Sequence, residues 1–177
     1  IDMKRGIKIL LPLLLMFLCS VVFAQEAEDI EAVGNWFVQV KVNPLTDEKE
    51  INMLTFDEGS EQIIDTKSLV IRLKDKPELF IVWKEYLGDN TLIRYRFDDG
   101  EVQKSHWQQS ANKTALFYPS NKRLKDFVKK LLNAEKLVVG ITPYNKTEQT
   151  AVFNLEGLKE AITPYLSDFG WEDLFEE

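Results

Sequence analysis

The sequence predicts a single α+β domain, in which a largely antiparallel β-sheet or sandwich-like meander is joined by two amphipathic helices in the C-terminal half. Short segments of alternating apolar and polar residues recur over residues 36–118 and are separated by tight polar turns, as in antiparallel strands. Two later segments repeat apolar residues at helical spacing. The chain has 177 residues, a usual length for one domain, and 45% of them are hydrophobic, which is enough for a core.

The first 24 residues have the features of a cleaved signal peptide. A basic segment at residues 3–8 precedes an apolar run over residues 9–23, and Ala24 is the small residue expected before the cleavage site. A permanent membrane anchor normally needs about 20 apolar residues. We therefore expect cleavage after Ala24, no membrane insertion of the mature chain, and a periplasmic or secreted location.

Charge and cysteine content limit the classes of function. Cys19 is the only cysteine and lies in the predicted signal peptide, so the mature chain has neither a disulfide nor a thiolate. The net charge is −7. Removing the one acidic and three basic side chains of residues 1–24 leaves 19 basic and 28 acidic side chains, a net charge of −9. This acidity argues against nucleic acid and against anionic membranes as partners.

The first predicted elements follow the signal peptide. Residues 25–35 form an acidic N-terminal segment, of which residues 25–33 are interpreted as a linker or one short helix. The α+β domain is expected over residues 36–177. In residues 36–42, Trp36, Val38 and Val40 share one face of a predicted strand. The turn residues at 43–47 and a second alternating segment at 50–56 predict a hairpin.

A meander of five further strands is predicted over residues 69–73, 79–86, 91–97, 102–108 and 114–118. The second of these, residues 79–86, is apolar on both faces, which predicts a central strand covered on both sides. The sequence Asp98-Asp99-Gly100 predicts a hairpin turn, because glycine tolerates the positive φ that such a turn requires.

The C-terminal half contains the two predicted helices. Ser120 or Asn121 is a suitable N-cap for the first. Its apolar stripe consists of Leu124, Phe127, Val128, Leu131 and Leu132. Strands are expected at residues 137–141 and 149–155. The last helix has apolar residues at Leu158, Ala161, Ile162, Tyr165 and Leu166. Pro164 lies inside that helix and is expected to kink it or end it early.

No catalytic or metal-binding constellation stands out. His106 is the only histidine, so a His/Cys metal site is excluded, and we expect no cofactor. A triad of Ser105 or Ser110 with His106 and Asp98 is disfavoured, because Ser105 and His106 point to opposite faces of a strand. Paired carboxylates remain a general option for an acidic protein, but the sequence distinguishes no particular pair. We assign no catalytic residue and no metal ligand.

Arg94 and Arg96 are the strongest candidates for binding a ligand or partner. They project from one face of a predicted strand, two residues apart, in an arrangement that suits a carboxylate or phosphate. Trp107 is a candidate neighbour, which either lines the same site or belongs to the core. The alternative for the arginines is a cross-strand ion pair with Glu85, Asp98 or Glu101.

Several short segments are shared with a known family: Trp36-Phe37-Val38, Asn43-Pro44-Leu45-Thr46-Asp47, Ser68-Leu69-Val70-Ile71-Arg72, Phe80-Ile81-Val82-Trp83, Tyr86-Leu87-Gly88, Arg94-Tyr95-Arg96-Phe97-Asp98, Trp107-Gln108-Gln109-Ser110, Thr150-Ala151-Val152-Phe153-Asn154-Leu155-Glu156-Gly157-Leu158, Ala161-Ile162-Thr163-Pro164 and the late Trp171. In these segments the chain resembles the periplasmic type VI secretion-associated proteins (VasI/TagO-like), although it lacks that family's cysteines. The resemblance implies a non-catalytic periplasmic accessory domain and brings no catalytic residues.

Three functions follow as hypotheses. The first is an exported accessory or binding protein with a protein partner in the cell envelope. The second is an inhibitor of an exported or invading enzyme such as a lysozyme or protease, since an acidic surface attracts a cationic enzyme. The third is a secreted hydrolase with paired carboxylates, which requires a cleft with two facing acids.

Overall fold

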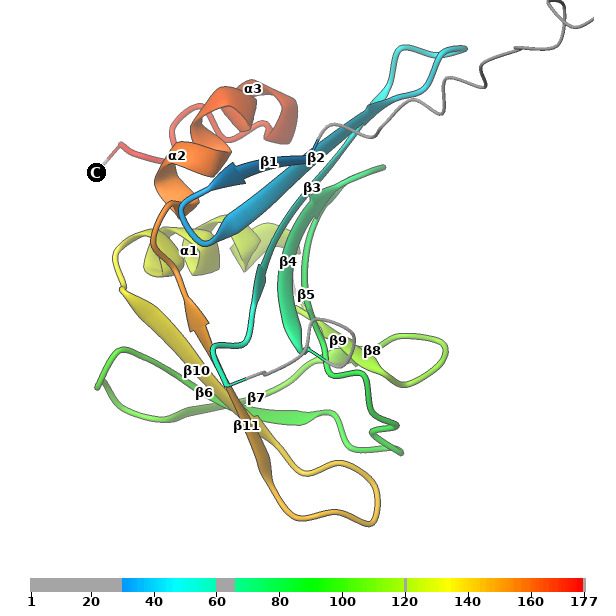
Figure 1. Ribbon diagram of the computed structural model, residues 1–177, viewed down its shortest axis with the longest axis vertical. Helices are drawn as coiled ribbons and strands as arrows, with labels where there is room; N and C mark the ends of the chain where they lie inside the picture. Colours follow the sequence, from blue (N-terminus) through cyan, green and yellow to red (C-terminus); the bar gives the residue numbers. More distant parts are fainter. Residues whose placement is uncertain (1–29, 60–65, 120, 177) are drawn as a thin grey trace, which may run out of the picture.

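The computed structural model describes residues 30–59, 66–119 and 121–176, so the predicted signal peptide and its cleavage site lie outside the described residues. These residues form two antiparallel sheets and a C-terminal set of helices, which confirms the predicted α+β class (Figure 1). The larger sheet has seven strands in the order β1-β2-β3-β4-β5-β9-β8. Its strands are β1 (Ile30–Val33), β2 (Trp36–Val42), β3 (Lys49–Phe56), β4 (Ser68–Leu73), β5 (Pro77–Val82), β8 (Gln108–Gln109) and β9 (Ala115–Phe117).

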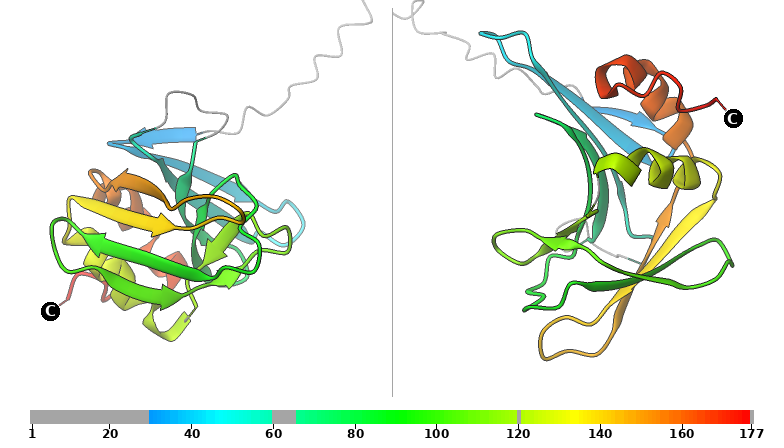
Figure 2. Two further views of the ribbon diagram at one scale, coloured as in Figure 1. Left: turned by 90° about the horizontal axis from the view of Figure 1, so that it is seen from below. Right: turned by 180° about the vertical axis from the view of Figure 1, so that it is seen from behind.

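The second sheet has four strands in the order β11-β10-β6-β7. These strands are β6 (Leu92–Phe97), β7 (Gln103–His106), β10 (Lys136–Ile141) and β11 (Gln149–Asn154). The helices are α1 (Asn121–Leu132), α2 (Leu158–Ile162), the 3-10 turn η2 (Thr163–Tyr165) and α3 (Leu166–Phe169). The helices and the smaller sheet lie on the same side of the larger sheet (Figures 1 and 2).

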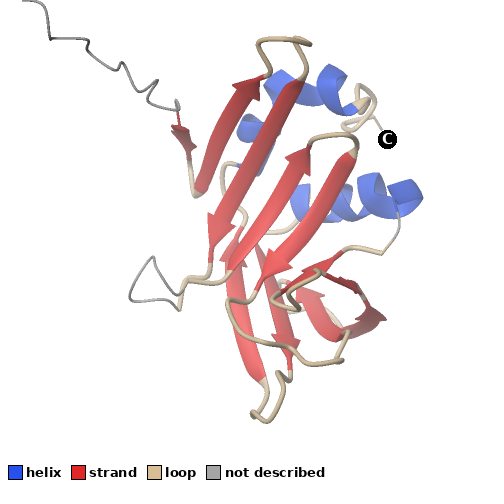
Figure 3. Ribbon diagram, turned by 90° about the vertical axis from the view of Figure 1, so that its right-hand side faces the viewer, coloured by secondary structure: helices blue, strands red, loops and turns tan. Residues whose placement is uncertain are grey.

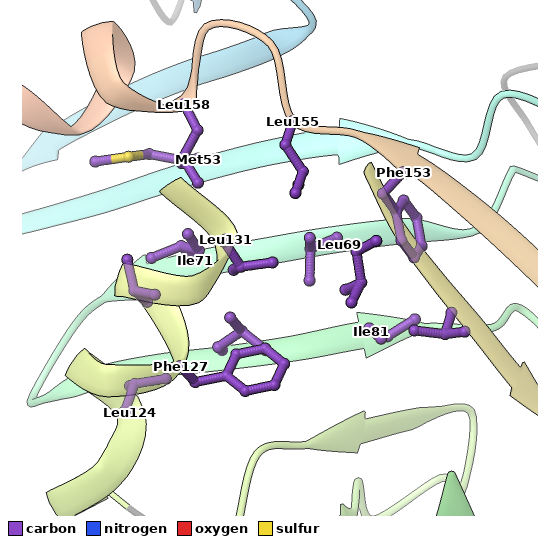
Figure 4. Packing of buried hydrophobic residues seen from close by; sticks show 14 of the residues in the cluster. Met53, Leu69, Ile71, Ile81, Leu124, Phe127, Leu131, Phe153, Leu155 and Leu158 are labelled. Carbon is purple, nitrogen blue, oxygen red and sulfur yellow. The ribbon is translucent and has the colours of Figure 1, made fainter. Parts of the chain in front are cut away.

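Helix α1 covers the larger sheet because one side of it is apolar. Its residues Phe127 and Leu131 are at most 3% exposed. The helix faces strands β4 and β5, whose residues Ile71 and Ile81 are both 0% exposed, and Leu131 lies beside Ile71 (Figure 4). Fully burying a side chain of this size contributes about 1.5–3 kcal/mol, so the predicted stripe fixes the helix on the sheet.

The last helical segment is interrupted where the sequence predicts. Helix α2 ends at Ile162, and η2 follows with Pro164 in its first turn before α3 begins. Proline removes one backbone donor and clashes with the preceding turn of an α-helix. This confirms the expected interruption at Pro164.

Strand β1 corrects the prediction of a linker or short helix for residues 25–33. The described part of that segment is neither a linker nor a helix, because Ile30–Val33 pairs with β2 in an antiparallel hairpin. The turn is Gly34-Asn35, with φ +57° at Gly34. Pairing with a strand that is anchored by Trp36 overrides the weak local preference of the acidic segment.

The turn of this first hairpin lies against the residue that precedes α2. The backbone N–H of Asn35 donates to the carbonyl of Glu156 at 3.1 Å. Gly157 has φ +89°, and a Cβ added to it would lie 2.4 Å from the carbonyl oxygen of Val33. A Cβ on Gly34 would lie 2.7 Å from the Glu156 carbonyl oxygen. Two glycines therefore permit direct contact between the first hairpin and the C-terminal helices.

The two edges of the four-stranded sheet differ. The β11 edge is closed by the chain that follows β3: the N–H of Glu58 donates to the Val152 carbonyl at 2.9 Å, and the N–H of Val152 donates to the Asp57 carboxylate at 2.8 Å. The β7 edge has no such cover among the described residues, since β7 pairs only with β6. One edge is sealed by the chain itself, and the other is open.

Figure 3 shows the face of the larger sheet over which no helix of the described residues lies. The strand register gives this face a band of apolar side chains. Cross-strand pairing aligns one residue from each of five strands: Phe37, Leu54, Val70, Phe80 and Phe117. Phe80 stacks on Phe117 with ring centroids 4.6 Å apart. No helix or strand of the described residues covers this band, so the expectation that residues 79–86 are covered on both sides is wrong. The strand also ends earlier, at Val82.

Candidate partner-binding face

Strand β6 places Arg94 and Arg96 on the outer face of the four-stranded sheet. Ile93, between Leu92 and Arg94, is 0% exposed and belongs to the core, and Tyr95 packs against that core. Because side chains alternate along a strand, the two arginines point away from the core. Figure 2, left, views the molecule from the side of this sheet.

Arg94 forms an ion pair with Glu148, which immediately precedes β11. The Glu148 carboxylate also lies over Gly140: a Cβ on Gly140 would be 2.8 Å from its Oε1 atom. The register places Arg94 directly opposite Gly140, so the glycine leaves room for the carboxylate beside the guanidinium. The prediction of an ion pair for Arg94 is therefore confirmed, but the three expected partners were wrong.

Two of those expected partners are occupied elsewhere. Glu85 pairs with Lys146 at 2.9 Å and accepts from the Gln149 side chain at 3.0 Å. Its partial burial acts to raise the pKa, but these hydrogen bonds and the Lys146 charge outweigh it and hold the Glu85 pKa below its usual value. The Asp98 carboxylate accepts from the backbone N–H groups of Glu135 and Lys136 at 2.9 and 3.0 Å.

Arg96 has no acidic partner within residues 30–59, 66–119 and 121–176, and neither has Lys104 of β7. Lys104 lies directly opposite Arg94 in the sheet and therefore on the same outer face. We call Arg94, Arg96 and Lys104 the cationic face. A shallow hollow of about 280 Å³ lies beside the two arginines, and Val102, Val138, Glu148 and Thr150 complete much of its lining.

Trp107 does not belong to this face. It is 2% exposed and lies on the core side of the sheet. Its ring packs among Tyr118, Phe127 and Tyr95, with centroid separations of 5.4, 5.9 and 6.3 Å. The candidate role of Trp107 as a surface neighbour of the arginines is therefore corrected: it is a core residue, and it contacts the inner side of the strand that carries them.

The residues of the disfavoured triad lie apart. His106 is opposite Leu92 at one end of β6, and its Nδ1 lies 2.9 Å from the Thr91 hydroxyl. Asp98 follows the other end of β6, roughly 20 Å away at about 3.3 Å per residue, and its carboxylate caps two backbone N–H groups. No group of three or more potential metal-ligating side chains occurs in the described parts of the chain.

A larger hollow, of about 530 Å³, lies between the end of α1 and the start of α2. Its charged lining is mainly acidic, with Glu58, Glu135, Glu156 and Glu160 against two lysines. Carboxylates of like charge repel an anionic ligand, and no metal-binding group is formed there by the described residues. The hollow therefore favours neither an anionic ligand nor, among the described residues, a metal ion.

Sequence reasoning missed Lys104 and Glu148. Lys104 had a usable signal, because the hairpin at Asp98-Asp99-Gly100 sets the register that brings it opposite Arg94. No local sequence signal pointed to Glu148. Its position beside Arg94 results from the pairing of β10 with both β6 and β11.

Among the described residues, no helix has the length and apolarity needed to cross a bilayer. No family model and no curated protein matches the chain. The crystal structure of invasion-associated protein B from Bartonella henselae is similar to it, with a TM-score of 0.58, 14% sequence identity, and coverage of 78% of this chain and 96% of that chain. This likeness shows that the two proteins share a fold.

Proposed function

We propose that this chain is an exported, non-catalytic accessory protein of the cell envelope that binds an acidic segment of a protein partner through the cationic face. Its support comes from the arrangement of charges on the four-stranded sheet, the signal-like N-terminal segment and the fold. The charge arrangement carries the proposal.

The decisive observation is that Arg96 and Lys104 have no acidic partner in the part of the chain that the structure describes, although the protein has a net charge of −7. Directly opposed like charges, such as Arg94 and Lys104, destabilise a sheet. Glu148 compensates one of these three charges, and two remain available. An arginine guanidinium binds a carboxylate through paired hydrogen bonds, so an acidic segment is the partner that this face favours.

The non-catalytic part of the proposal is supported by the hydrogen bonds and ion pairs that already occupy the candidate catalytic side chains. The carboxylate of Asp98 is bound to backbone N–H groups, and the single histidine is bound to Thr91. The hollow beside the arginines contains one carboxylate, Glu148, which is already paired. A glycosidase-type pair of free carboxylates is not formed there.

The accessory role is supported by two likenesses. The fold is shared with a protein whose name describes it as invasion-associated, and several short segments resemble the type VI secretion-associated proteins. A role in type VI secretion is the narrower form of the proposal. Its test is the genomic neighbourhood: genes for that secretion system beside this one support it, and their consistent absence overturns it.

The binding proposal is tested with fluorescently labelled hexaglutamate and the purified chain at low ionic strength. We expect saturable binding that weakens as salt is added, because exposed charges are screened. The double variant Arg96→Ala/Lys104→Ala should bind on the order of tenfold more weakly, since each exposed ion pair contributes up to about 1 kcal/mol.

The matched control is Lys76→Ala/Lys122→Ala, which removes two exposed cations outside the face. It should bind hexaglutamate as the wild type does after allowance for the changed net charge. If both double variants lose the same affinity for hexaglutamate, binding depends only on total charge, and the proposal fails.

A further inference from the structure

The open edge of β7 gives the cationic face a second recognition element: unpaired backbone groups. The N–H of Trp107 donates to the Thr91 carbonyl at 2.9 Å. In an antiparallel pair, residues alternate between those that bond to the neighbouring strand and those that point away from it. By that alternation, Gln103 and Ser105 bond to β6, whereas the backbone groups of Lys104 and His106 face outward.

The same residues carry side chains on the cationic face. Lys104 is opposite Arg94, and His106 is opposite Leu92, so both share the outer face with the arginines. The following position toward the turn, Val102, is 59% exposed. The open edge thus presents an apolar side chain, a cation and an imidazole in a row, spaced two residues apart.

The contrast with the opposite edge of the same sheet is informative. Asp57 and Glu58 occupy the backbone groups of β11, which is one way in which proteins prevent a new strand from pairing there. No described segment does so at β7. Lys104 is the kind of charge that discourages indiscriminate pairing at an edge, but it attracts a strand that carries a carboxylate at the matching position.

We propose that the acidic partner binds by strand addition: an extended segment pairs with β7 and becomes the fifth strand of the smaller sheet. Main-chain hydrogen bonds to Lys104 and His106 supply affinity, and alternate side chains supply specificity. The segment carries an apolar residue that faces Val102 and carboxylates that face Lys104 and His106. This inference rests on the proposed function, and it specifies the conformation and pattern of the partner.

Strand addition is tested with three synthetic peptides and the full chain. The first, acetyl-Thr-Glu-Thr-Glu-Thr-Val-Thr-amide, places two glutamates and a valine on one face of a strand. The second has the same composition with the two glutamates adjacent, so that they point to opposite faces. The third is the first peptide with alternate backbone nitrogens methylated on the pairing edge, which removes those hydrogen-bond donors.

We expect the first peptide to bind more tightly than the other two and to slow hydrogen exchange at the amides of Lys104 and His106 by at least about tenfold, as a new ladder bond protects them. The amides of Gln103 and Ser105 already face β6 and should change little. The charge reversal Lys104→Glu should weaken the binding of the first peptide on the order of fivefold. The control Lys122→Glu should leave that affinity unchanged.

The outcomes separate the two proposals. Equal binding of all three peptides, lost in the Lys104→Glu variant and without amide protection, would overturn strand addition and leave the binding of acidic segments intact. Failure of every peptide to bind at low ionic strength, together with failure of hexaglutamate, would overturn both. Protection confined to the first peptide supports strand addition.

Discussion

At Gly157 the backbone of the C-terminal half approaches the first hairpin so closely that no side chain fits. Alanine there would place its Cβ 2.4 Å from the Val33 carbonyl oxygen and would retain a φ of +89°. We expect Gly157→Ala to lower the free energy of unfolding by about 2–4 kcal/mol, from the clash and the left-handed backbone together. Chemical denaturation of the purified protein measures this loss.

Gly170 provides the control for that substitution. It also has a positive φ, +66°, but a Cβ there would meet no atom within 4 Å. Gly170→Ala should therefore lower the free energy of unfolding only through the left-handed backbone conformation, by about 1–2 kcal/mol. If the two variants lose the same stability, close contact at Gly157 is not what constrains it.

Asp173 gives a residue-level prediction of pH dependence. A hydrogen bond from Lys125, a backbone hydrogen bond and the lysine charge hold the pKa of Asp173 below its usual value of 3.8. A carboxyl whose pKa is lower in the folded state stabilises the fold above pH 3.8, and this contribution is lost as the pH falls through the folded-state pKa. Asp173→Asn should therefore reduce stability at pH 7 and flatten its decline below pH 3.8, as followed by thermal unfolding at several pH values. An unchanged decline would show that this pair contributes nothing.

The residues of the candidate site show what local sequence can and cannot reveal. Alternation alone placed Arg94 and Arg96 correctly on an outer face. It also held the information that Trp107 points inward, because Trp107 shares a face of its strand with Ser105, which lies opposite the buried Ile93. Glu148 could not be identified, because its position depends on the register of two hairpins joined through β10.

At the scale of elements, the segment after β3 protects the edge of β11. Asp57→Ala removes the acceptor of the Val152 N–H, and a lost hydrogen bond of this kind costs about 1–3 kcal/mol. We expect faster hydrogen exchange at the Val152 amide in this variant. Glu58→Ala is the control. It keeps the backbone N–H that bonds to Val152 and removes only a carboxylate that accepts from the Asn154 side chain, so the exchange of the Val152 amide should be nearly unchanged.

Strand β5 tests the difference between the two faces of the larger sheet. Leu79 is 1% exposed and points to the core, whereas Phe80 is only partly buried on the helix-free face. We expect Leu79→Ala to cost about 2–5 kcal/mol. Phe80→Ala should cost less, about 1–2 kcal/mol, from lost contacts with Phe117 and Arg72. Equal costs, measured by denaturation, would indicate that both faces are covered.

Helices and strands were predictable where their residue patterns lie within one short stretch of sequence. The stripe of α1 and the interruption at Pro164 follow directly from spacing and proline chemistry. Strand β1 was missed because its acidic composition obscured the hairpin signal Gly34-Asn35. The extent of β5 was overestimated because an apolar run does not show whether its second face is covered.

At the scale of the whole molecule, the two sheets are interleaved along the chain. The chain leaves the larger sheet after β5, forms β6 and β7, returns for β8 and β9, crosses α1, and only then completes the smaller sheet with β10 and β11. Sequence patterns predicted a largely antiparallel sheet or sandwich-like meander with two helices. They could not divide the strands between two sheets, because that division depends on long-range pairing.

Interleaving predicts a single cooperative unfolding transition. Neither sheet is contiguous in the sequence, so neither can unfold while the other remains intact. Far-ultraviolet circular dichroism, which follows the strands, and tryptophan fluorescence, which follows the buried indoles, should give coincident denaturation curves. Two separated transitions would show that the sheets are independent units.

The sealed edge of β11 also bears on when the protein can fold. Residues 57 and 58 cannot find their partners until residue 152 is present, and the first hairpin cannot meet Gly157 until still later. A chain that is still being synthesised or transferred therefore cannot complete the contacts that close the fold. That late closure suits a polypeptide that must pass through a narrow channel before it takes its final shape, as the proposed export requires.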